Sequence, residues 1–272
     1  MPGIPELRLS TGDTIPQVGF GTWQITEEAA CIEAVSLALA AGYRHIDTAQ
    51  LYGNEQYVGE AIRQSGIARE ELFLTTKVNP LTPGPWRIKS NFERSLARLQ
   101  TDYVDLLLLH FPVPPRLRSW RMLEEIHEAG TAKAIGVSNY TIRHLEGLMK
   151  HSTIKPAVNQ VELHVFLQQP KLVQFCKDND IAVEAYSPLA HGKGMDHPVL
   201  SELGSKHGKT PAQIMLRWCI EQGTVPLPKS VRQNRIRQNL DVFDFTLDEA
   251  DMQSLAGLGK AKRTNFNPGL IP

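Results

Sequence analysis

The chain has 272 residues, of which 42% are hydrophobic and 21% are charged, and its 29 basic residues balance 29 acidic ones. This composition is typical of a globular protein with a large core, and no run of about 18 apolar residues indicates a membrane span. Balanced charge provides no global positive field, so neither nucleic acid nor an acidic membrane is an expected partner. The first residues lack the basic and apolar regions of a secretory signal, and we expect a cytoplasmic protein.

The three cysteines, Cys31, Cys176 and Cys219, lie far apart in the sequence and are odd in number. This spacing contains neither a disulfide framework nor a Cys-x-x-Cys motif for a metal or for redox chemistry. We therefore expect buried thiols that pack as small hydrophobic groups, and no metal centre.

The chain opens with a segment, residues 6–21, that predicts a β-hairpin turning at Gly12 and Asp13. From there one kind of unit recurs: a short apolar run rich in β-forming residues, a polar loop and an amphipathic stretch. We expect eight strands, at residues 18–21, 43–47, 72–77, 103–110, 132–138, 157–163, 181–187 and 224–228.

Helical patterns separate these strands. Thr26 is the expected N-cap of the first helix, Gly42 and Gly130 are expected C-terminal stops, and Thr210 with Pro211 predicts an N-cap and a first helical residue. Apolar residues recur at the spacing of one helix face in three groups: Ile32, Val35 and Leu39; Val58, Ala61 and Ile62; Ile88, Phe92, Leu96 and Leu99.

Strict alternation of strands and helices predicts a parallel sheet, which is either open and doubly wound or closed into a barrel. Eight units without a linker or a break in composition favour a (β/α)8 TIM barrel. The dinucleotide fingerprint of an open sheet is absent, since Gly19 and Gly21 are followed by Gln24 where a third glycine belongs. The leading hairpin is then expected to cap the N-terminal end of the barrel.

Active sites of such barrels are built at the carboxyl ends of the strands. After the second expected strand, Gly53 and Asn54 predict a turn and the N-cap of the next helix. The residues at or just beyond the strand ends are nearly all polar or aromatic: Trp23, Asp47, Tyr52, Lys77, His110, Ser138, Asn139, Gln160, Tyr186, Ser187 and Lys229.

Four of these residues form a set that can handle protons. Asp47 can pair with Lys77, whose ammonium can lower the pKa of the Tyr52 phenol, and His110 can donate to a carbonyl oxygen. Taken singly, each has a structural alternative: Asp47 as a turn cap, Lys77 extended toward solvent, and His110 as a core histidine.

With these residues in this order, the sequence closely resembles the aldo-keto reductase family, in particular the bacterial and plant branch related to 2,5-diketogluconate reductase. The resemblance covers essentially the whole chain, and its signatures occur in the family's order: "GYRHIDTAQLYGNE" from Gly42, "TTK" ending at Lys77, "LLLLHFP" around His110, "AIGVSNY" around Ser138, "NQVELH" from Asn159, "AYSPLAHGKG" from Ala185 and "LPKSVRQNRIRQN" from Leu227.

The resemblance implies a single barrel domain over residues 1–272 that reduces aldehydes or ketones to alcohols with NADPH. Asp47, Tyr52, Lys77 and His110 would be its catalytic tetrad, with Tyr52 protonating the developing alkoxide and neutral His110 stabilising its charge. The implied partner is a small-molecule carbonyl compound, and we expect a monomer.

The resemblance also implies the cofactor contacts. Lys229, Ser230 and Arg235, near the start of the last barrel helix, suit the 2'-phosphate of NADPH, although they could simply be a solvated basic helix face. Gln238 stands where relatives often have Glu, beside the adenine-binding Asn239. The full set of cofactor residues implied is Gly21, Thr22, Asp47, Ser138, Asn139, Gln160, Tyr186, Ser187, Leu189, Lys229, Ser230, Arg235, Gln238 and Asn239.

For the substrate, the resemblance implies a wide mouth, because the segment from Pro112 to Trp120 and the tail after Leu258 are short for the family. Phe111 occupies a position where the family often has Trp. The expected substrate contacts are Trp23, Tyr52, Asn79, Trp86, His110 and Phe111.

Two functions of other classes stay open. Some proteins with this fold serve as non-catalytic NADP-binding subunits of larger assemblies. The other is a metal-dependent barrel hydrolase built on His110, His164 and His191, although no short metal-ligand spacing supports it.

Overall fold

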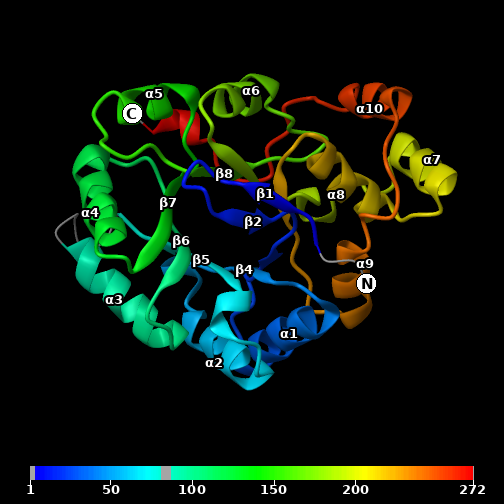
Figure 1. Cartoon of the computed structure of the whole chain (residues 1–272). Coiled ribbons are helices and arrows are strands. Elements are labelled where there is room, and N and C mark those ends of the chain that lie inside the picture. Colours follow the sequence, from blue (N-terminus) through cyan, green and yellow to red (C-terminus); the bar gives the residue numbers. More distant parts are fainter. Residues whose placement is uncertain (1–3, 81–86, 272) are drawn as a thin grey trace.

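The computed structural model describes residues 4–80 and 87–271 (Figure 1). Eight parallel strands follow one another around a sheet in chain order. The strands are β3 (Phe20–Gly21), β4 (His45–Asp47), β5 (Phe73–Val78), β6 (Val104–Leu109), β7 (Ala132–Ser138), β8 (Val158–Glu162), β9 (Ala182–Tyr186) and β10 (Val225–Leu227).

Backbone hydrogen bonds join the first and last strands of this sheet. The N–H of Gly19 donates to the carbonyl oxygen of Pro226, and that of Gly21 donates to Pro228, each at 3.0 Å. The sheet is therefore a nearly closed barrel, as the alternation of strands and helices predicted, and all eight expected strands are confirmed within a few residues.

The helices form a ring around the barrel (Figure 1). They are α1 (Glu28–Ala41), α2 (Glu55–Ser65), α3 (Ile88–Leu99), α4 (Arg116–Glu128), α5 (Ile142–Met149), α6 (Pro170–Asp178), α7 (Pro198–His207), α8 (Pro211–Glu221), α9 (Gln233–Leu240) and α10 (Glu249–Ala256). Their apolar faces and the outer face of the barrel share one large hydrophobic cluster.

Helix ends follow the sequence signals only in part. Gly42 ends α1 in the left-handed conformation, and Thr210 forms a capping box at the start of α8 with Pro211 next to it. The prediction for Thr26 was wrong, because Glu27 occupies the N-cap position of α1 without a side-chain cap. Asn54 does stand at the N-cap of α2, but its side chain makes no capping bond. It bonds instead to the side chain of Thr48 and to two backbone carbonyls of the first barrel loop.

The leading hairpin consists of β1 (Glu6–Arg8) and β2 (Thr14–Pro16), which pair antiparallel across the end of the barrel (Figure 1). Its Leu9 and Ile15 belong to the hydrophobic cluster inside the barrel, where they join Phe73 and Val225. Phe73 and Val225 begin their strands, so the hairpin closes the N-terminal end as expected. The open mouth is left at the carboxyl ends of the strands.

The cysteines and the lengths of the helices bear on two further expectations. The thiols of Cys31, Cys176 and Cys219 are free and buried, which confirms their interpretation as core residues. Over residues 4–80 and 87–271, none of the helices combines the length and apolar character that a bilayer crossing requires.

The close packing of the barrel strands can be tested at Gly136 in β7. A β-carbon there would lie 2.6 Å from the backbone oxygen of Val158 and 2.7 Å from Leu108 Cδ2. We expect Gly136→Ala to lower the free energy of unfolding by about 1–3 kcal/mol, measured by urea denaturation. The matched control is Gly147→Ala in α5, where a β-carbon meets nothing within 4 Å. The control should raise stability slightly, since alanine favours a helix. Equal stability of the two variants would contradict the tight packing.

Candidate active site

A cavity of about 890 Å³ opens at the carboxyl ends of the barrel strands. Its volume lies at the upper end of the range for small-molecule and cofactor sites. The predicted site residues that line it are Gly21, Trp23, Asp47, Tyr52, His110, Phe111, Ser138, Asn139, Gln160, Tyr186, Ser187, Leu189, Lys229, Ser230, Arg235, Gln238 and Asn239. Residues from the first barrel strand, β3, to helix α9 thus meet in one cavity.

Some predicted site residues do not reach the cavity wall. Thr22 is buried beside it and donates its hydroxyl to the backbone oxygen of Asp47. Lys77 is fully buried and reaches the cavity only through its bonds to Asp47 and Tyr52, which do line it. Asn79 is buried and bonded through its backbone N–H to Gln50, so its substrate contact remains a prediction only. Trp86 lies outside the described residues.

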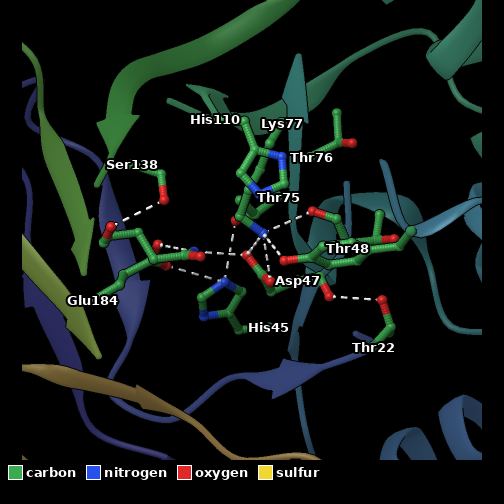
Figure 2. A network of polar contacts seen from close by, with 12 residues as sticks. Thr22, His45, Asp47, Thr48, Thr75, Thr76, Lys77, His110, Ser138 and Glu184 are labelled. Carbon is green, nitrogen blue, oxygen red and sulfur yellow. Dashed lines mark hydrogen bonds and ion pairs between the residues drawn. The ribbon is translucent and has the colours of Figure 1, made fainter. Parts of the chain in front are cut away.

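The floor of the cavity is organised around Lys77 (Figure 2). Its ammonium donates to both carboxylate oxygens of Asp47 at 2.7 Å, to the backbone oxygen of Thr48 at 2.9 Å and to the Tyr52 hydroxyl at 3.3 Å. The side chain of Lys77 is 0% exposed, so the alternative of a lysine extended toward solvent is wrong. The predicted pairing of Lys77 with Asp47 is present.

Burial and charge act in opposite directions on these groups. Burial opposes the charge on Lys77, but its acidic neighbours, above all Asp47, hold its pKa above the ordinary value. Burial raises the pKa of Tyr52, and the nearby Lys77 offsets only part of that rise. The predicted net lowering of the Tyr52 pKa was therefore wrong, because the sequence does not show how far the phenol is desolvated. Tyr52 keeps its proton at neutral pH.

His110 follows β6 and is 7% exposed. Its ring stacks on Phe111 with centroids 4.5 Å apart, and the edge of Tyr52 approaches it at 5.8 Å. Burial and the positive charge of Lys77 place its pKa well below the ordinary value. The imidazole is accordingly neutral near pH 7, as expected.

A second group of polar side chains links the four residues of the predicted tetrad to the neighbouring strands. Asn139 donates to the backbone oxygen of His110 at 2.9 Å and accepts from the Tyr186 hydroxyl at 2.8 Å. Ser138 donates to the backbone oxygen of Gln160, whose amide in turn donates to Asp47. Hydrogen bonds therefore hold the side chains of β7, β8 and β9 in fixed positions around the cavity.

Two buried residues of the same network were not predicted. Glu184 of β9 accepts from the Gln160 amide at 2.8 Å, and its other carboxylate oxygen lies 3.5 Å from the ring of His45 (Figure 2). His45 also contacts the Thr75 hydroxyl at 3.1 Å. The signal for Glu184 was present, since one carboxylate interrupts an otherwise apolar strand in "IAVEAYS".

The far side of the cavity is formed by the segment before α9 and by that helix itself. Lys229, Ser230 and Arg235 line it, and Arg235 is exposed, as a ligand contact requires. The Ser230 hydroxyl accepts from the backbone N–H of Arg232 at 3.0 Å. A hydroxyl, an ammonium and a guanidinium thus share one wall, as the sequence predicted.

The mouth includes residues of the C-terminal tail that the strand-end argument missed. Phe266 lines the cavity and contacts Phe111 at 5.4 Å between ring centroids. The tail is held by Glu162 at the end of β8, which accepts from the backbone and the hydroxyl of Thr264 at 2.5 and 2.6 Å. Although burial opposes the charge on Glu162, hydrogen bonds from His164 and Thr264 lower its pKa to about 2.

The three histidines of the hydrolase hypothesis do not form a ligand set. His110 and His191 line the cavity, but His164 is fully buried and faces Glu162. In the described part of the chain, no three residues among His, Cys, Asp and Glu are arranged to hold a metal ion.

A parallel eight-stranded barrel with a lysine–carboxylate pair, a phenol and a neutral imidazole at its mouth defines an enzyme of the α/β-barrel class. Comparison with known proteins identifies the family within that class. Residues 17–260 match the family model described as the aldo/keto reductase family. The chain belongs to the aldo/keto reductase family and is an oxidoreductase.

Relatives support this over nearly the full length. The chain is 44% identical over 263 residues to glyoxal reductase of Bacillus subtilis, covering 96% of this chain and 95% of that protein. It is 42% identical over 267 residues to methylglyoxal reductase DkgA of Escherichia coli K12, covering 96% of each.

Solved structures agree with the sequence comparison. An aldo/keto reductase from Brucella melitensis is 46% identical, with a TM-score of 0.90 over 94% of this chain and 99% of that one. A Bombyx mori aldo-keto reductase in complex with NADP is 34% identical, with a TM-score of 0.92 over 98% of this chain and 96% of that one.

The depressed pKa of His110 leads to a spectroscopic prediction. We expect its ring nitrogens to show the neutral form throughout about pH 5 to 8, where an exposed histidine would titrate. Nitrogen-15 NMR measures this, and the His110→Gln spectrum identifies the resonance. Lys77→Met should raise the His110 pKa, because a neighbouring positive charge is removed while the burial stays. A midpoint near 6.5 in the unmodified protein would contradict the environment described.

Proposed function

We propose that this enzyme reduces aldehydes or ketones to alcohols with hydride from NADPH, and that Tyr52 is the general acid. The observation that carries this proposal is the contact of one buried ammonium, Lys77, with both the Asp47 carboxylate and the Tyr52 hydroxyl. NADPH, when bound, supplies the hydride that adds to the carbonyl carbon.

Tyr52 donates the proton. Because burial keeps its pKa high, the hydroxyl carries a proton at neutral pH and can give it to the oxygen on which negative charge develops. Lys77 stabilises the phenolate that results, and Asp47 holds Lys77 in place. In the reverse direction the same phenolate accepts the proton of the alcohol.

His110 stabilises the reacting oxygen without adding a charge. Its neutral ring can donate an N–H, and the stacking on Phe111 fixes the plane of the imidazole. A donor held in place in a site largely shielded from water stabilises developing negative charge more strongly than it would in water.

The cofactor fits the polar groups of the cavity. We propose that Ser138, Asn139 and Gln160 hold the carboxamide of nicotinamide, while the ring of Tyr186 packs against its face. At the other wall, Lys229, Ser230 and Arg235 would bind the 2'-phosphate. Gly21, Thr22, Ser187, Leu189, Gln238 and Asn239 complete the proposed contacts. The complex of the Bombyx mori relative with NADP supports this choice of cofactor.

Small aldehydes are the substrates we propose to assay first. The names of the Bacillus subtilis and Escherichia coli relatives support glyoxal and methylglyoxal. Trp23, Phe111 and Phe266 offer an aromatic mouth to such compounds. A non-catalytic NADP-binding role is opposed by the proximity of Asp47 and Tyr52 to the Lys77 ammonium.

Tyr52→Phe tests the proton donor. We expect turnover of methylglyoxal to fall about 100-fold or more, the usual effect of losing a positioned acid. The affinity for NADPH, measured by fluorescence titration, should change little. Tyr57→Phe in α2, which removes a hydroxyl away from the cavity, is the matched control and should keep its activity. Turnover close to the wild-type rate would remove Tyr52 from the mechanism.

Arg235→Ala tests the recognition of the 2'-phosphate. Loss of a charge-assisted contact of this kind should raise the dissociation constant for NADPH by about tenfold or more, while that for NADH stays within a few-fold. Arg237→Ala on the same helix is the control, since Arg237 is exposed and does not line the cavity. If the dissociation constants for NADPH and NADH rise by the same factor, Arg235 supports the helix and does not recognise the phosphate.

A further inference from the structure

We propose that Glu184 is a positioning residue that orients the Gln160 amide toward nicotinamide and whose charge responds to the oxidation state of the bound cofactor. The inference rests on the proposed function, because it takes the nicotinamide end of NADP(H) to lie against Gln160. It adds a residue that neither the tetrad nor the proposed cofactor contacts include.

The Gln160 amide stands between two carboxylates. Its nitrogen donates to Asp47 Oδ2 and to Glu184 Oε2, each at 2.8 Å. A primary amide has two N–H donors, so both are used by the two acids. The carbonyl oxygen of the side chain is the group left to accept a hydrogen bond, and Gln160 lines the cavity. The amino group of a carboxamide is the complementary donor.

Without Glu184, Asp47 alone would restrain this amide. Gln160 and Glu184 are both almost completely buried, so water does not compete for the hydrogen bond between them. Asp47 turns the amide nitrogen toward itself, and Glu184 adds a second acceptor for the same nitrogen at Oε2, whether or not Oε1 carries a proton. Glu184 thereby helps to fix the position of the Gln160 side-chain oxygen, which is the acceptor offered to the ligand.

The charged and titratable groups that face Glu184 come from β4 and β5. His45 and Asp47 belong to β4, Lys77 belongs to β5, and Tyr52 acts from the loop that follows β4. On the two strands that pair with β9, the cross-strand partners of Glu184 are uncharged: Gln160 in β8 and Val225 in β10.

The carboxylate of Glu184 is poorly satisfied for a structural group. Its Oε1 has no hydrogen-bond partner among the described residues, and the nearest ring nitrogen, on His45, is 3.5 Å away. Burial and Lys77 lower the pKa of His45 to about 3, so this histidine brings no positive charge. A buried acid with one good hydrogen bond beside another carboxylate is more typical of a functional site than of a structural anchor.

The charge of Glu184 can therefore respond to a ligand, because the group titrates close to neutral pH. Burial and the charge of Asp47 raise its pKa to about 8, so the group is mostly protonated at neutral pH and ionises just above it. Oxidised nicotinamide carries a positive ring, whereas reduced nicotinamide is neutral. A positive ring next to Gln160 favours the ionised form of Glu184, so binding of NADP+ releases a proton and tightens as the pH rises through 8.

The test measures cofactor binding, so it does not depend on the activity of the enzyme. We expect the dissociation constant of NADP+ to fall by about threefold or more between pH 7 and pH 9 in the wild type, on the scale of one moderately screened charge pair. Glu184→Gln should abolish this pH dependence. The probe 2'-phospho-ADP-ribose, which lacks nicotinamide, should bind equally well to both proteins at each pH.

Glu124→Gln is the matched control. Glu124 is also a buried acid, but it accepts hydrogen bonds from Trp120 and from two backbone N–H groups away from the cavity. This variant should keep the pH dependence of NADP+ binding. Persistence of the wild-type dependence in Glu184→Gln would overturn the proposal. So would an equal loss of affinity for NADP+ and for 2'-phospho-ADP-ribose, because that result assigns Glu184 to the scaffold.

A measurement on the unsubstituted protein covers the case in which the variant does not fold. Calorimetric titration at pH 8 in two buffers of different ionisation enthalpy counts the protons released on binding. NADP+ should release a fraction of one proton more than 2'-phospho-ADP-ribose does, and equal release would overturn the proposal. An inactive Tyr52→Phe protein should still show the difference, so failure of the proposed acid and failure of this inference are separate results.

Discussion

The site depends on one charge placed where water cannot reach it. An isolated ammonium buried as deeply as Lys77 would cost several kcal/mol, and that cost is offset only when well-placed acceptors surround it. Two oxygens of Asp47 and a backbone carbonyl of Thr48 provide them. Because Asp47 and Lys77 come from adjacent strands, the pairing of β4 with β5 and the integrity of the site stabilise each other.

Several properties of the cavity follow from this charge. It depresses the pKa of His110, limits the rise in the pKa of Tyr52, and makes a second buried acid, Glu184, tolerable near Asp47. The leading hairpin closes the N-terminal end of the barrel and so shields Lys77 from solvent on that side. The geometry of the proposed catalytic groups and the packing of the barrel therefore depend on each other.

Much of this arrangement could be predicted from the chain. Apolar runs at regular intervals indicated all eight strands, and the rule that barrel sites form at the carboxyl ends of strands brought distant residues such as Lys77 and Gln160 into one list. The rule works because parallel strands share an edge, whatever the details of packing.

Hydrogen-bond partners are less predictable from the sequence. Asn54 has the sequence of a helix cap, yet tertiary contacts with Thr48 and two carbonyls use its side chain.

Burial was the other quantity that the sequence did not reveal. The direction of the Tyr52 pKa depends on desolvation, which outweighs the visible effect of a lysine nearby. Glu184 was missed because a single acid in an apolar strand gives the same pattern whether it faces the barrel interior or the outer face. Phe266 was missed because it follows α10 and is placed at the mouth by tertiary contacts of the tail, among them those of Thr264 with Glu162 and of Asn265 with Ser187.

The tail that carries Phe266 separates two aspects of the enzyme. The floor of the cavity is built from barrel strands whose register is constrained by the buried core, whereas part of the entrance is built from a segment attached at Glu162 and, through Ile271, at the start of α5. Substitutions in such a segment reshape the entrance while the strands keep their alignment. Divergence in the choice of substrate can therefore proceed at the end of the chain, with the groups proposed to transfer the proton and the folding of the barrel inherited unchanged.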